Sequence, residues 1–235
     1  MADGDARIVV ATHNEGKLAE MRSILDACIH GLPGEQAARM ERFTLVSAGQ
    51  LGLPDPVETG LTFEQNALLK AGDVTERTGL PAIADDSGLV VDVMGAAPGI
   101  LSARWSGVHG DDRANMRLLL AQLKDLSEDD LGARFVTAAA LVLPAGMGKE
   151  EVADRKGPTE FIRTGRMDGH LVHRPRGDQG FGYDPIFVPD DQPERARRAG
   201  VELTSAELEP AEKNAISHRG KALKAIMPIL IRALS

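Results

Sequence analysis

The chain has 235 residues, 43% of them hydrophobic, which suits one large globular domain or two tightly fused lobes. Its formal net charge of −8, from 27 basic and 35 acidic residues, argues against a polynucleotide-binding protein, because such proteins usually carry a basic surface. A small anionic ligand remains compatible with this charge, since a local cluster of cations or a metal reverses its sign.

Cysteine content and hydropathy indicate the compartment. The single cysteine, Cys28, excludes an intramolecular disulfide and fits a reducing cytosol. No run of about 18 or more apolar residues occurs, so no transmembrane helix is expected. The segment Met1–Asp5 is acidic and lacks the basic and apolar regions of a signal peptide. We therefore expect a cytoplasmic protein that does not bind membranes.

The first part of the chain reads as a strand, a loop and a helix. Arg7–Thr12 is rich in β-branched residues and predicts a buried strand. After a loop at Asn14–Gly16, the apolar spacing over Lys17–Ala27 predicts a helix. Gly31–Arg42 is polar, contains glycine and proline, and is interpreted as a loop or insertion; Phe43–Val46 is interpreted as a second strand. This opening is typical of α/β proteins.

The middle of the chain leads to a pair of acids. Thr62–Arg77 is predicted to form a helix with its first residue as the N-cap. Ala82–Ala84 is predicted to be a strand that delivers Asp85-Asp86 to a turn, and Leu89–Val93 a further strand.

The second half of the chain contains most of the remaining strands. Asp111–Leu126 is predicted to be a helix, Asp190–Gly200 a charged loop, and Ser217–Ala233 the closing helix. Three more strands are expected at Arg134–Leu143, Thr159–Arg166 and Ile186–Val188. Because strands are numerous and crossover helices few, a mixed sheet is expected, with Thr159–Arg166 in an antiparallel part.

The acid pair is the most informative motif. It lies in Ala84-Asp85-Asp86-Ser87-Gly88-Leu89, between apolar residues. Carboxylates delivered by a buried strand are costly unless their charge is compensated, and a divalent metal is the usual compensation. One acid could ligate Mg²⁺ while the other orients or deprotonates water. The alternative is a solvated acidic turn, which the apolar flanks disfavour.

A polar cluster follows the first strand and opens the first helix. It reads Thr12-His13-Asn14-Glu15-Gly16-Lys17. Helix N-termini offer free N–H groups and a positive dipole end, which suit phosphate, and Asn14 and Lys17 can add donors. The cluster is not the Gly-x-x-x-x-Gly-Lys-Ser/Thr phosphate loop. Taken alone, it is also compatible with an ordinary strand-to-helix turn.

A second polar cluster surrounds the start of the Thr62 helix. Asn66 and Lys70 are four residues apart and share one helix face, which could reach a ligand. Glu58 precedes the helix, where a carboxylate could serve a metal or the helix dipole. A capped amphipathic helix with solvated polar residues is the alternative interpretation.

Aromatic and cationic residues near the C-terminus suggest base recognition. Gly180-Phe181-Gly182-Tyr183-Asp184-Pro185 would let a flat base approach the Phe181 ring and stack. The side chains of Lys213, His218 and Arg219 are donors and would favour a 6-keto purine over adenine, since a mismatched buried donor is left unpaired. Core packing of the aromatic residues and simple polarity at a helix N-terminus are the alternatives.

Together these clusters closely resemble the inosine/xanthosine triphosphate pyrophosphatase family, which removes deaminated purine nucleotides. Six blocks match in family order over nearly the whole chain. They are Ala11–Lys17, Glu58–Ala67, Ala84–Leu89, Gly95–Ile100 with Ser102–Arg104, Gly180–Phe187 and Glu212–Gly220.

The resemblance implies hydrolysis of ITP, dITP and XTP to the monophosphate and pyrophosphate with Mg²⁺. It implies a single nucleoside triphosphate pyrophosphatase domain over residues 1–235, without a separable linker. The implied fold is an elongated, two-lobed α/β fold around a long mixed β-sheet flanked by helices, with the active-site cleft between the lobes. A homodimer is also implied.

The resemblance also assigns residues. Asp86 matches the catalytic base and a metal ligand, and Glu58 the second metal carboxylate, with Asp85 as its weaker competitor. Ser87 matches a substrate contact. The phosphate-binding loop matches Thr12, His13, Asn14, Glu15, Gly16 and Lys17. The base-recognition residues match Phe181, Gly182, Tyr183, Asp184, Lys213, His218 and Arg219.

The sequence departs from the family pattern in a few places. His13 stands where the family usually has a small or short polar residue, so it could add a phosphate contact or narrow the loop. Leu101 and Trp105 replace residues that are more often aromatic and tyrosine-like. The Gly31–Arg42 and Asp190–Gly200 segments are longer than the family minimum, and we expect both at the surface.

Two other functions are alternatives to a purine nucleoside triphosphate pyrophosphatase. A pyrophosphatase for modified pyrimidine nucleotides would share a similar fold, but its motifs are not found here. A non-catalytic purine nucleotide sensor would be expected to lose Asp86 or the metal carboxylates while it keeps the base pocket, and this chain keeps both.

Overall fold

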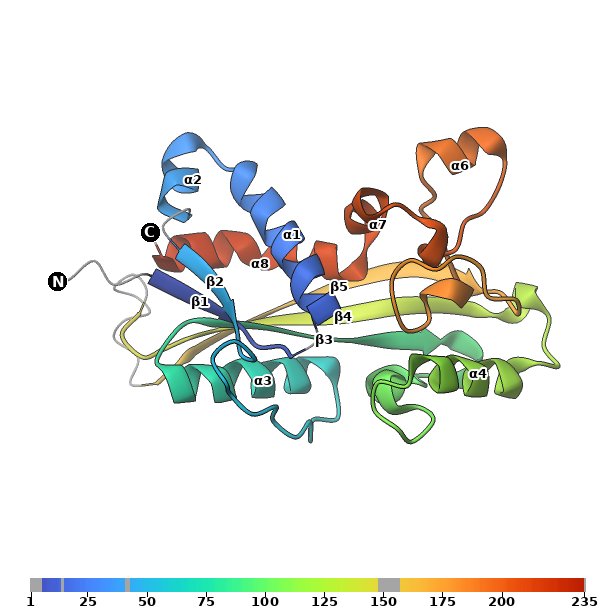
Figure 1. The fold of residues 1–235 in the computed structure, drawn as a ribbon, viewed down its shortest axis with the longest axis horizontal. Helices are drawn as coiled ribbons and strands as arrows, with labels where there is room; N and C mark the ends of the chain where they lie inside the picture. The colour runs from blue at the N-terminus through green and yellow to red at the C-terminus, as the bar shows by residue number, and fades with distance from the viewer. Residues whose placement is uncertain (1–5, 14, 41–42, 148–156, 235) are drawn as a thin grey trace. The chain divides into compact units, whose positions relative to one another are not determined.

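A computed structural model describes residues 6–13, 15–40, 43–147 and 157–234 (Figure 1). It contains a six-stranded sheet with helices packed on it, in the strand order β2-β1-β3-β4-β5-β6. The strands are β1 (Ala6–Val10), β2 (Phe43–Ser47), β3 (Ala82–Val91), β4 (Gly132–Leu143), β5 (Thr159–Leu171) and β6 (Phe187–Pro189).

The described helices include α1 (Glu15–His30), α2 (Gly34–Met40), α3 (Phe63–Thr78), α4 (Asp112–Leu123), α6 (Glu194–Ala199), α7 (Pro210–Ile216) and α8 (His218–Leu234). Short 3₁₀ helices are η1 (Asp92–Met94), η2 (Gly99–Arg104), η3 (Glu128–Asp130), η4 (Asp184–Ile186) and η5 (Ser205–Glu207). None of the described helices combines the length and the apolar composition that crossing a membrane requires.

The sheet is mixed, as predicted. β1 pairs in parallel with β2, in a register that places Ile8 opposite Leu45, and in parallel with β3. β5 and β6 pair antiparallel, with His170 opposite Val188. The predicted strands at Arg7–Thr12, Phe43–Val46 and near Ile186 are confirmed within a few residues at their ends.

The chain divides into two compact units. The first comprises the described residues within 1–86, 138–164 and 219–235, and the second those within 87–137 and 165–218. The chain passes between them within β3, β4 and β5, so each of these three strands contributes residues to both units.

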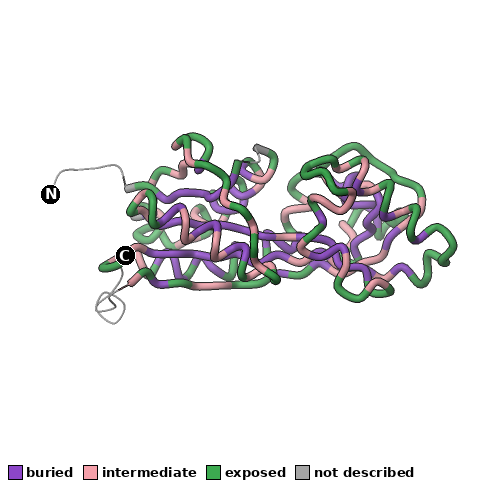
Figure 2. The backbone as a smooth tube through the Cα atoms, turned by 90° about the horizontal axis from the view of Figure 1, so that it is seen from below, coloured by how far each residue is buried: buried purple, intermediate pink, exposed green. Residues whose placement is uncertain are grey.

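In the first unit, successive residues of β1, β3 and β4 are buried, so these strands are covered on both faces of the sheet (Figure 2). Because side chains alternate along a strand, Ile8 and Val10 of β1 join one core with α1 and α8, whereas Val9 joins another with α3. β4 divides in the same way: Leu141 belongs to the first core and Val142 to the second. Burial on two faces explains why these strands read as continuous apolar runs rather than as alternating patterns.

The second unit has its own core. The C-terminal half of β3 and the start of β4 pack there with α4 and with Phe187 of β6. Leu119 and Leu123 of α4 are buried, and Met116 and Leu120 pack partly buried against the same core, as the apolar spacing predicts.

The predicted turn at the acid pair is wrong. β3 runs without interruption from Ala82 to Val91, so Asp85 and Asp86 lie inside a strand. The separate strand expected at Leu89–Val93 is the end of β3 as far as Val91, and its last two residues begin η1. A sequence of two acids followed by serine and glycine is typical of a turn. Here, however, all the residues of β3 except Ser87 are buried, and sheet pairing and packing override the local signal.

Two predicted loops contain helices. Within Gly31–Arg42, α2 follows Pro33, a residue suited to a helix start, and buries Met40 in the core. Within Asp190–Gly200, α6 is supported by an ion pair between Glu194 and Arg198 and ends at Gly200, whose φ of 64° closes the helix. Neither helix is long enough to give a clear period in the sequence.

The N-cap of α3 confirms the prediction for Thr62. Its hydroxyl accepts from the backbone N of Gln65 at 3.2 Å. Replacing Thr62 by alanine removes this acceptor, so we expect the free energy of unfolding to fall by about 1 kcal/mol in urea denaturation. Thr62→Ser keeps a hydroxyl acceptor and should lose much less of the free energy of unfolding. An equal loss of stability in both variants would contradict a capping role.

Candidate functional site

Two carboxylates converge on one lysine in the first unit. The ammonium of Lys70 lies 2.8 Å from Oε1 of Glu58 and 2.9 Å from Oδ1 of Asp86. Asn66 donates from Nδ2 to the other oxygen of Asp86 at 3.3 Å. Asn66 and Lys70 therefore use the shared face of α3, as predicted, and that face reaches the acid pair.

Burial sets the electrostatics of this cluster. Burial raises the pKa of Asp86; Lys70 opposes the shift, and the nearby Glu58 carboxylate adds to it. Burial alone would lower the pKa of Lys70, but the attraction of Asp86, Asp85 and Glu58 outweighs it, and the pKa is raised. Lys70 is thus a fixed cation between two acids.

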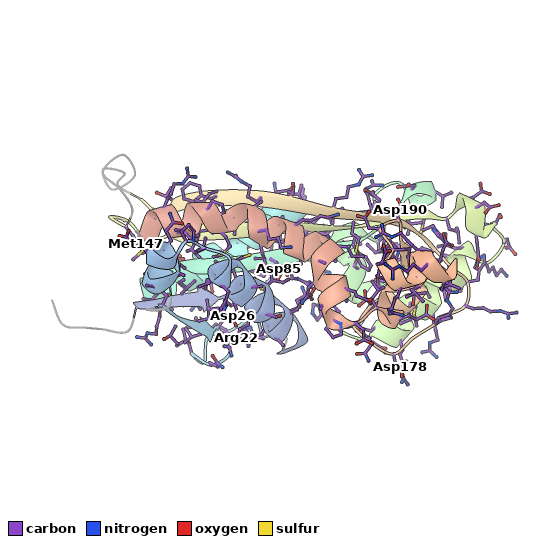
Figure 3. All side chains as sticks on the ribbon, turned by 90° about the horizontal axis from the view of Figure 1, so that it is seen from above. Arg22, Asp26, Asp85, Met147, Asp178 and Asp190 are labelled. Carbon is purple, nitrogen blue, oxygen red and sulfur yellow. The ribbon has the colours of Figure 1, made fainter. Side chains whose placement is uncertain are left out.

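Asp85 faces different partners from its neighbour. Arg219 of α8 donates from Nε to Oδ2 of Asp85 at 3.0 Å, and both side chains are only 2% exposed. Lys17 of α1 lies 3.9 Å from the same oxygen, and Arg219 also pairs with Glu20. Figure 3 labels Asp85 between α1 and α8, the two helices that supply these cations.

The cations hold Asp85 ionised. Burial alone would raise the pKa of Asp85, but Lys17 and Arg219 outweigh it and hold the pKa well below its ordinary value. Successive residues of a strand point to opposite faces, so the two acids of β3 are served from different sides. α1 and α8 neutralise Asp85, and α3 contacts Asp86.

The donor set fits a metal that shares its ligands with a substrate. Glu58 and Asp86 each place an oxygen within 3 Å of one nitrogen, so both carboxylates face one point. Mg²⁺ is usually held by one or two carboxylates plus waters and substrate phosphates. In the described part of the chain, no group of three or more His, Cys, Asp or Glu side chains could hold a metal by itself.

The predicted phosphate loop lies between β1 and α1. Thr12 is buried and Lys17 occupies the first turn of α1, where its ammonium approaches Asp85. Gly16 is exposed, Asn14 falls outside the described residues, and Glu15 begins the helix. His13 contacts Asp55 through Nδ1 at 2.9 Å and the backbone oxygen of Leu53 through Nε2 at 2.7 Å.

The second unit contains the segment Gly180–Pro185, which carries Phe181 and Tyr183. Oδ2 of Asp184 accepts from the backbone N of Phe181 at 2.8 Å and from the Lys213 ammonium at 2.7 Å. The ammonium also lies 5.3 Å from the centre of the Phe181 ring, within cation–π range. Asp112, at the start of α4, accepts from the backbone N of Gly182 at 2.9 Å.

Tyr183 and His218 are buried in the second unit. The Tyr183 hydroxyl donates to the backbone oxygen of Ser102 at 2.9 Å, and burial raises the pKa of Tyr183, with a contribution from Asp112. The His218 ring stacks on Phe135, with centres 4.9 Å apart and planes 12° from parallel.

The predicted site residues thus form two groups. Those in the first unit are Thr12, His13, Glu15, Gly16, Lys17, Glu58, Asp86 and Arg219. Those in the second unit are Ser87, Phe181, Gly182, Tyr183, Asp184, Lys213 and His218. The guanidinium of Arg219, expected with the base-recognition residues, contacts Asp85 and Glu20.

Several contact residues were missing from the predicted site. Lys70 and Asn66 were noted for their shared face but not assigned to Asp86. Glu20 lies one turn after Lys17, a spacing that places both on one side of α1 and could have indicated it. Asp112 follows the N-cap Asp111, and its contact with Gly182 joins residues 70 positions apart, which no local pattern reveals.

The fold is a mixed α/β fold, and its buried charged groups gather around Asp85 and Asp86 of β3, an inner strand of the sheet. Residues 8–229 match the Ham1 family. The chain therefore belongs to the Ham1 family.

Relatives match nearly the full chain. This chain is 58% identical over 237 residues to the dITP/XTP pyrophosphatase of Bifidobacterium animalis subsp. lactis. The match covers 95% of this chain and 96% of that protein. It is 50% identical over 226 residues to the dITP/XTP pyrophosphatase of Streptomyces avermitilis, with coverages of 95% and 96%.

Solved structures agree with this assignment. The nucleoside-triphosphatase / dITP/XTP pyrophosphatase from Mycobacterium abscessus is 45% identical, has a TM-score of 0.66, and covers 94% of this chain and 99% of that one. A HAM1 protein from Coxiella burnetii is 36% identical, with a TM-score of 0.71 and coverages of 95% and 98%.

The ion pair between Arg219 and Asp85 predicts a stability effect. Arg219→Leu removes the cation that the buried Asp85 shares with Glu20 and leaves Lys17, at 3.9 Å, as the nearby cation of Asp85, so we expect the free energy of unfolding in urea to fall by about 3–5 kcal/mol. Arg77→Leu, which removes an exposed partner of Asp73 on α3, is the matched control and should change much less. Equal effects of the two substitutions would contradict a structural role for the buried pair.

Proposed function

We propose that this chain hydrolyses dITP, XTP and ITP to the nucleoside monophosphate and pyrophosphate, and so removes deaminated purines from the nucleotide pool. The observation that carries the proposal is the 58% identity, over 95% of the chain, to a dITP/XTP pyrophosphatase. The Glu58–Lys70–Asp86 cluster supports it, because phosphoryl transfer depends on positioned charges more than on covalent chemistry.

We propose Glu58 and Asp86 as the carboxylates that hold Mg²⁺ together with substrate phosphates. Bound there, Mg²⁺ would supply stabilisation for the negative charge that develops on the phosphate oxygens. Lys70 and Asn66 orient the oxygens of Asp86, and Lys70 also contacts Glu58. Asp85, already paired with Arg219, is the weaker candidate ligand.

Asp86 is also the proposed base. It would take a proton from water as the water oxygen bonds to the α-phosphorus and the bond to the pyrophosphate oxygen breaks. A carboxylate whose pKa is raised by burial is a better proton acceptor than an exposed one. The lysine and asparagine contacts support this role, because they fix the orientation of the carboxylate before reaction.

The loop before α1 is proposed to bind the phosphates through Thr12, Asn14, Glu15, Gly16 and Lys17. Its position before α1 supports this, since backbone N–H groups at a helix N-terminus attract anions. Lys17 adds a cation in the first turn of that helix. Ser87, next to Asp86 and partly exposed, is the proposed additional substrate contact.

Base recognition is proposed for Phe181, Gly182, Tyr183, Asp184, Lys213, His218 and Arg219. Phe181 is 36% exposed, which leaves ring surface for stacking. The ammonium of Lys213, held by Asp184 beside that ring, is a donor suited to the 6-keto oxygen of hypoxanthine or xanthine. Adenine offers an amino donor at the same position, so the ammonium would face a second donor instead of an acceptor.

Three further expectations rest on the family resemblance and stay predictions. They are two lobes with an active-site cleft between them, a homodimer, and a cytoplasmic location. A purine nucleotide sensor without turnover and a pyrophosphatase for modified pyrimidine nucleotides are the alternative functions, and activity on ITP with Mg²⁺ separates them from the proposal.

The reaction is tested by its products. With Mg²⁺, we expect ITP to give monophosphate and pyrophosphate in phosphorus NMR and ATP to give little of either. Orthophosphate and diphosphate would mean attack at the γ-phosphorus and would contradict the proposal. Binding of ITP without turnover would favour the sensor, and a chelator control should abolish hydrolysis.

The role of Asp86 is tested by Asp86→Asn, which keeps the shape and removes the charge. We expect ITP turnover to fall on the order of 10²-fold or more while the circular dichroism spectrum is retained. Asp26→Asn, an exposed acid on α1, is the matched control and should leave turnover unchanged. Turnover of Asp86→Asn close to that of the control would exclude Asp86 as the base.

A further inference from the structure

The side chain of His13 joins two parts of the first unit that are far apart in sequence. His13 follows β1, whereas its partners Leu53 and Asp55 lie 40 and 42 residues further along the chain. Its Nε2 lies 2.7 Å from the Leu53 oxygen and its Nδ1 2.9 Å from Oδ1 of Asp55. We call these two contacts the His13 brace.

Both partners of His13 are acceptors. A backbone oxygen and an ionised carboxylate accept hydrogen bonds and have no proton to donate. Each contact is therefore a hydrogen bond only when the facing ring nitrogen carries a proton. The neutral ring makes one of the two bonds, and the imidazolium makes both, so the ring contacts this segment in either state.

The segment that His13 contacts leads directly to Glu58. Residues 53–60 lie outside the described helices and strands. Leu53 donates its backbone N to Ala48 at the start of the segment, and Gly60 donates its backbone N to Asn66 at the end. Glu58 lies between these points and reaches Lys70.

Two prolines make this segment stiff. Pro54 and Pro56 flank Asp55, and proline fixes its own φ and restricts the residue before it to extended conformations. Contacts at Leu53 and Asp55 therefore limit the path of the backbone to Glu58, three residues beyond Asp55. A flexible segment would not transmit the contact in this way.

We propose that His13 is a positioning residue that holds the Glu58 carboxylate in place for the metal, rather than a phosphate ligand. The inference rests on the proposed function for the role of Glu58. Direct binding of phosphate by either ring nitrogen would break a contact with Leu53 or Asp55. His13 therefore couples the phosphate loop to the metal carboxylate through the backbone of residues 53–58.

The test uses the purified full chain and the variants His13→Ala, Asp55→Ala and the double variant. Mg²⁺ is titrated at saturating ITP, and ITP at saturating Mg²⁺. We expect each single variant to raise the half-activating Mg²⁺ concentration roughly 3- to 10-fold, with the KM for ITP changed less than about 2-fold. The double variant should be no worse than His13→Ala, because that substitution already removes both contacts of the brace, including the one with Asp55.

Asp55 separates this role from phosphate binding. It carries negative charge and lies outside the phosphate loop, so its loss should not weaken phosphate binding directly. His109→Ala, an exposed histidine in the second unit, is the matched control and should leave the Mg²⁺ requirement unchanged. Asp55→Asn keeps an acceptor oxygen, so its half-activating Mg²⁺ concentration should stay much closer to that of the parent chain than that of Asp55→Ala does.

Hydrogen–deuterium exchange gives a readout that needs neither metal nor substrate. We expect faster exchange over residues 53–60 in His13→Ala and Asp55→Ala than in the parent chain, and no change in His109→Ala. Unchanged exchange and Mg²⁺ requirement, together with a raised KM for ITP in His13→Ala alone, would overturn the brace in favour of a phosphate contact.

The two proposals fail differently. A parent chain that does not hydrolyse ITP would overturn the proposed function and, with it, the role of the brace in metal activation. Unchanged exchange in an active enzyme would overturn the brace alone.

Discussion

The fold of the first unit depends on one constraint, the burial of two adjacent carboxylates in the middle of a strand. Asp85 is 3% exposed and Asp86 7%. Ionised groups at such positions are tolerated only when cations and hydrogen-bond donors surround them. The strand turns the two acids to opposite faces, so the compensation has to come from helices on both sides of the sheet.

Three helices meet this requirement. Lys17 of α1 and Arg219 of α8 approach Asp85, and Lys70 of α3 contacts Asp86. The same helices supply the apolar residues of the two cores that cover the sheet. Packing and electrostatics therefore specify one arrangement: shifting a helix along the strand would both open the core and leave a buried carboxylate without its cation.

The sequence allowed the larger part of the fold to be predicted, because long periodic segments such as α3 and α8 have strong local signals. It led to an error at Asp85-Asp86-Ser87-Gly88, where a local turn pattern lies in a continuous strand. The reason is physical: the partners that make burial of the acids tolerable lie far away in sequence, with Arg219 134 residues from Asp85. The motifs identified the acids, but not Lys70 as a contact of Asp86 or Glu20 as the second partner of Arg219.

The difference between the two acids follows from the charges around each. Asp85 and Glu20 face Arg219, with Lys17 nearby, so two carboxylates meet two cations. Among the ion pairs of the described residues, Asp86 and Glu58 share the ammonium of Lys70, so two carboxylates face one cation there. A divalent cation is favoured where carboxylates outnumber cations, as they do among these contacts of the described residues. Asp85 is thus suited to fixing the geometry of β3, and Asp86 to the chemistry that this geometry positions.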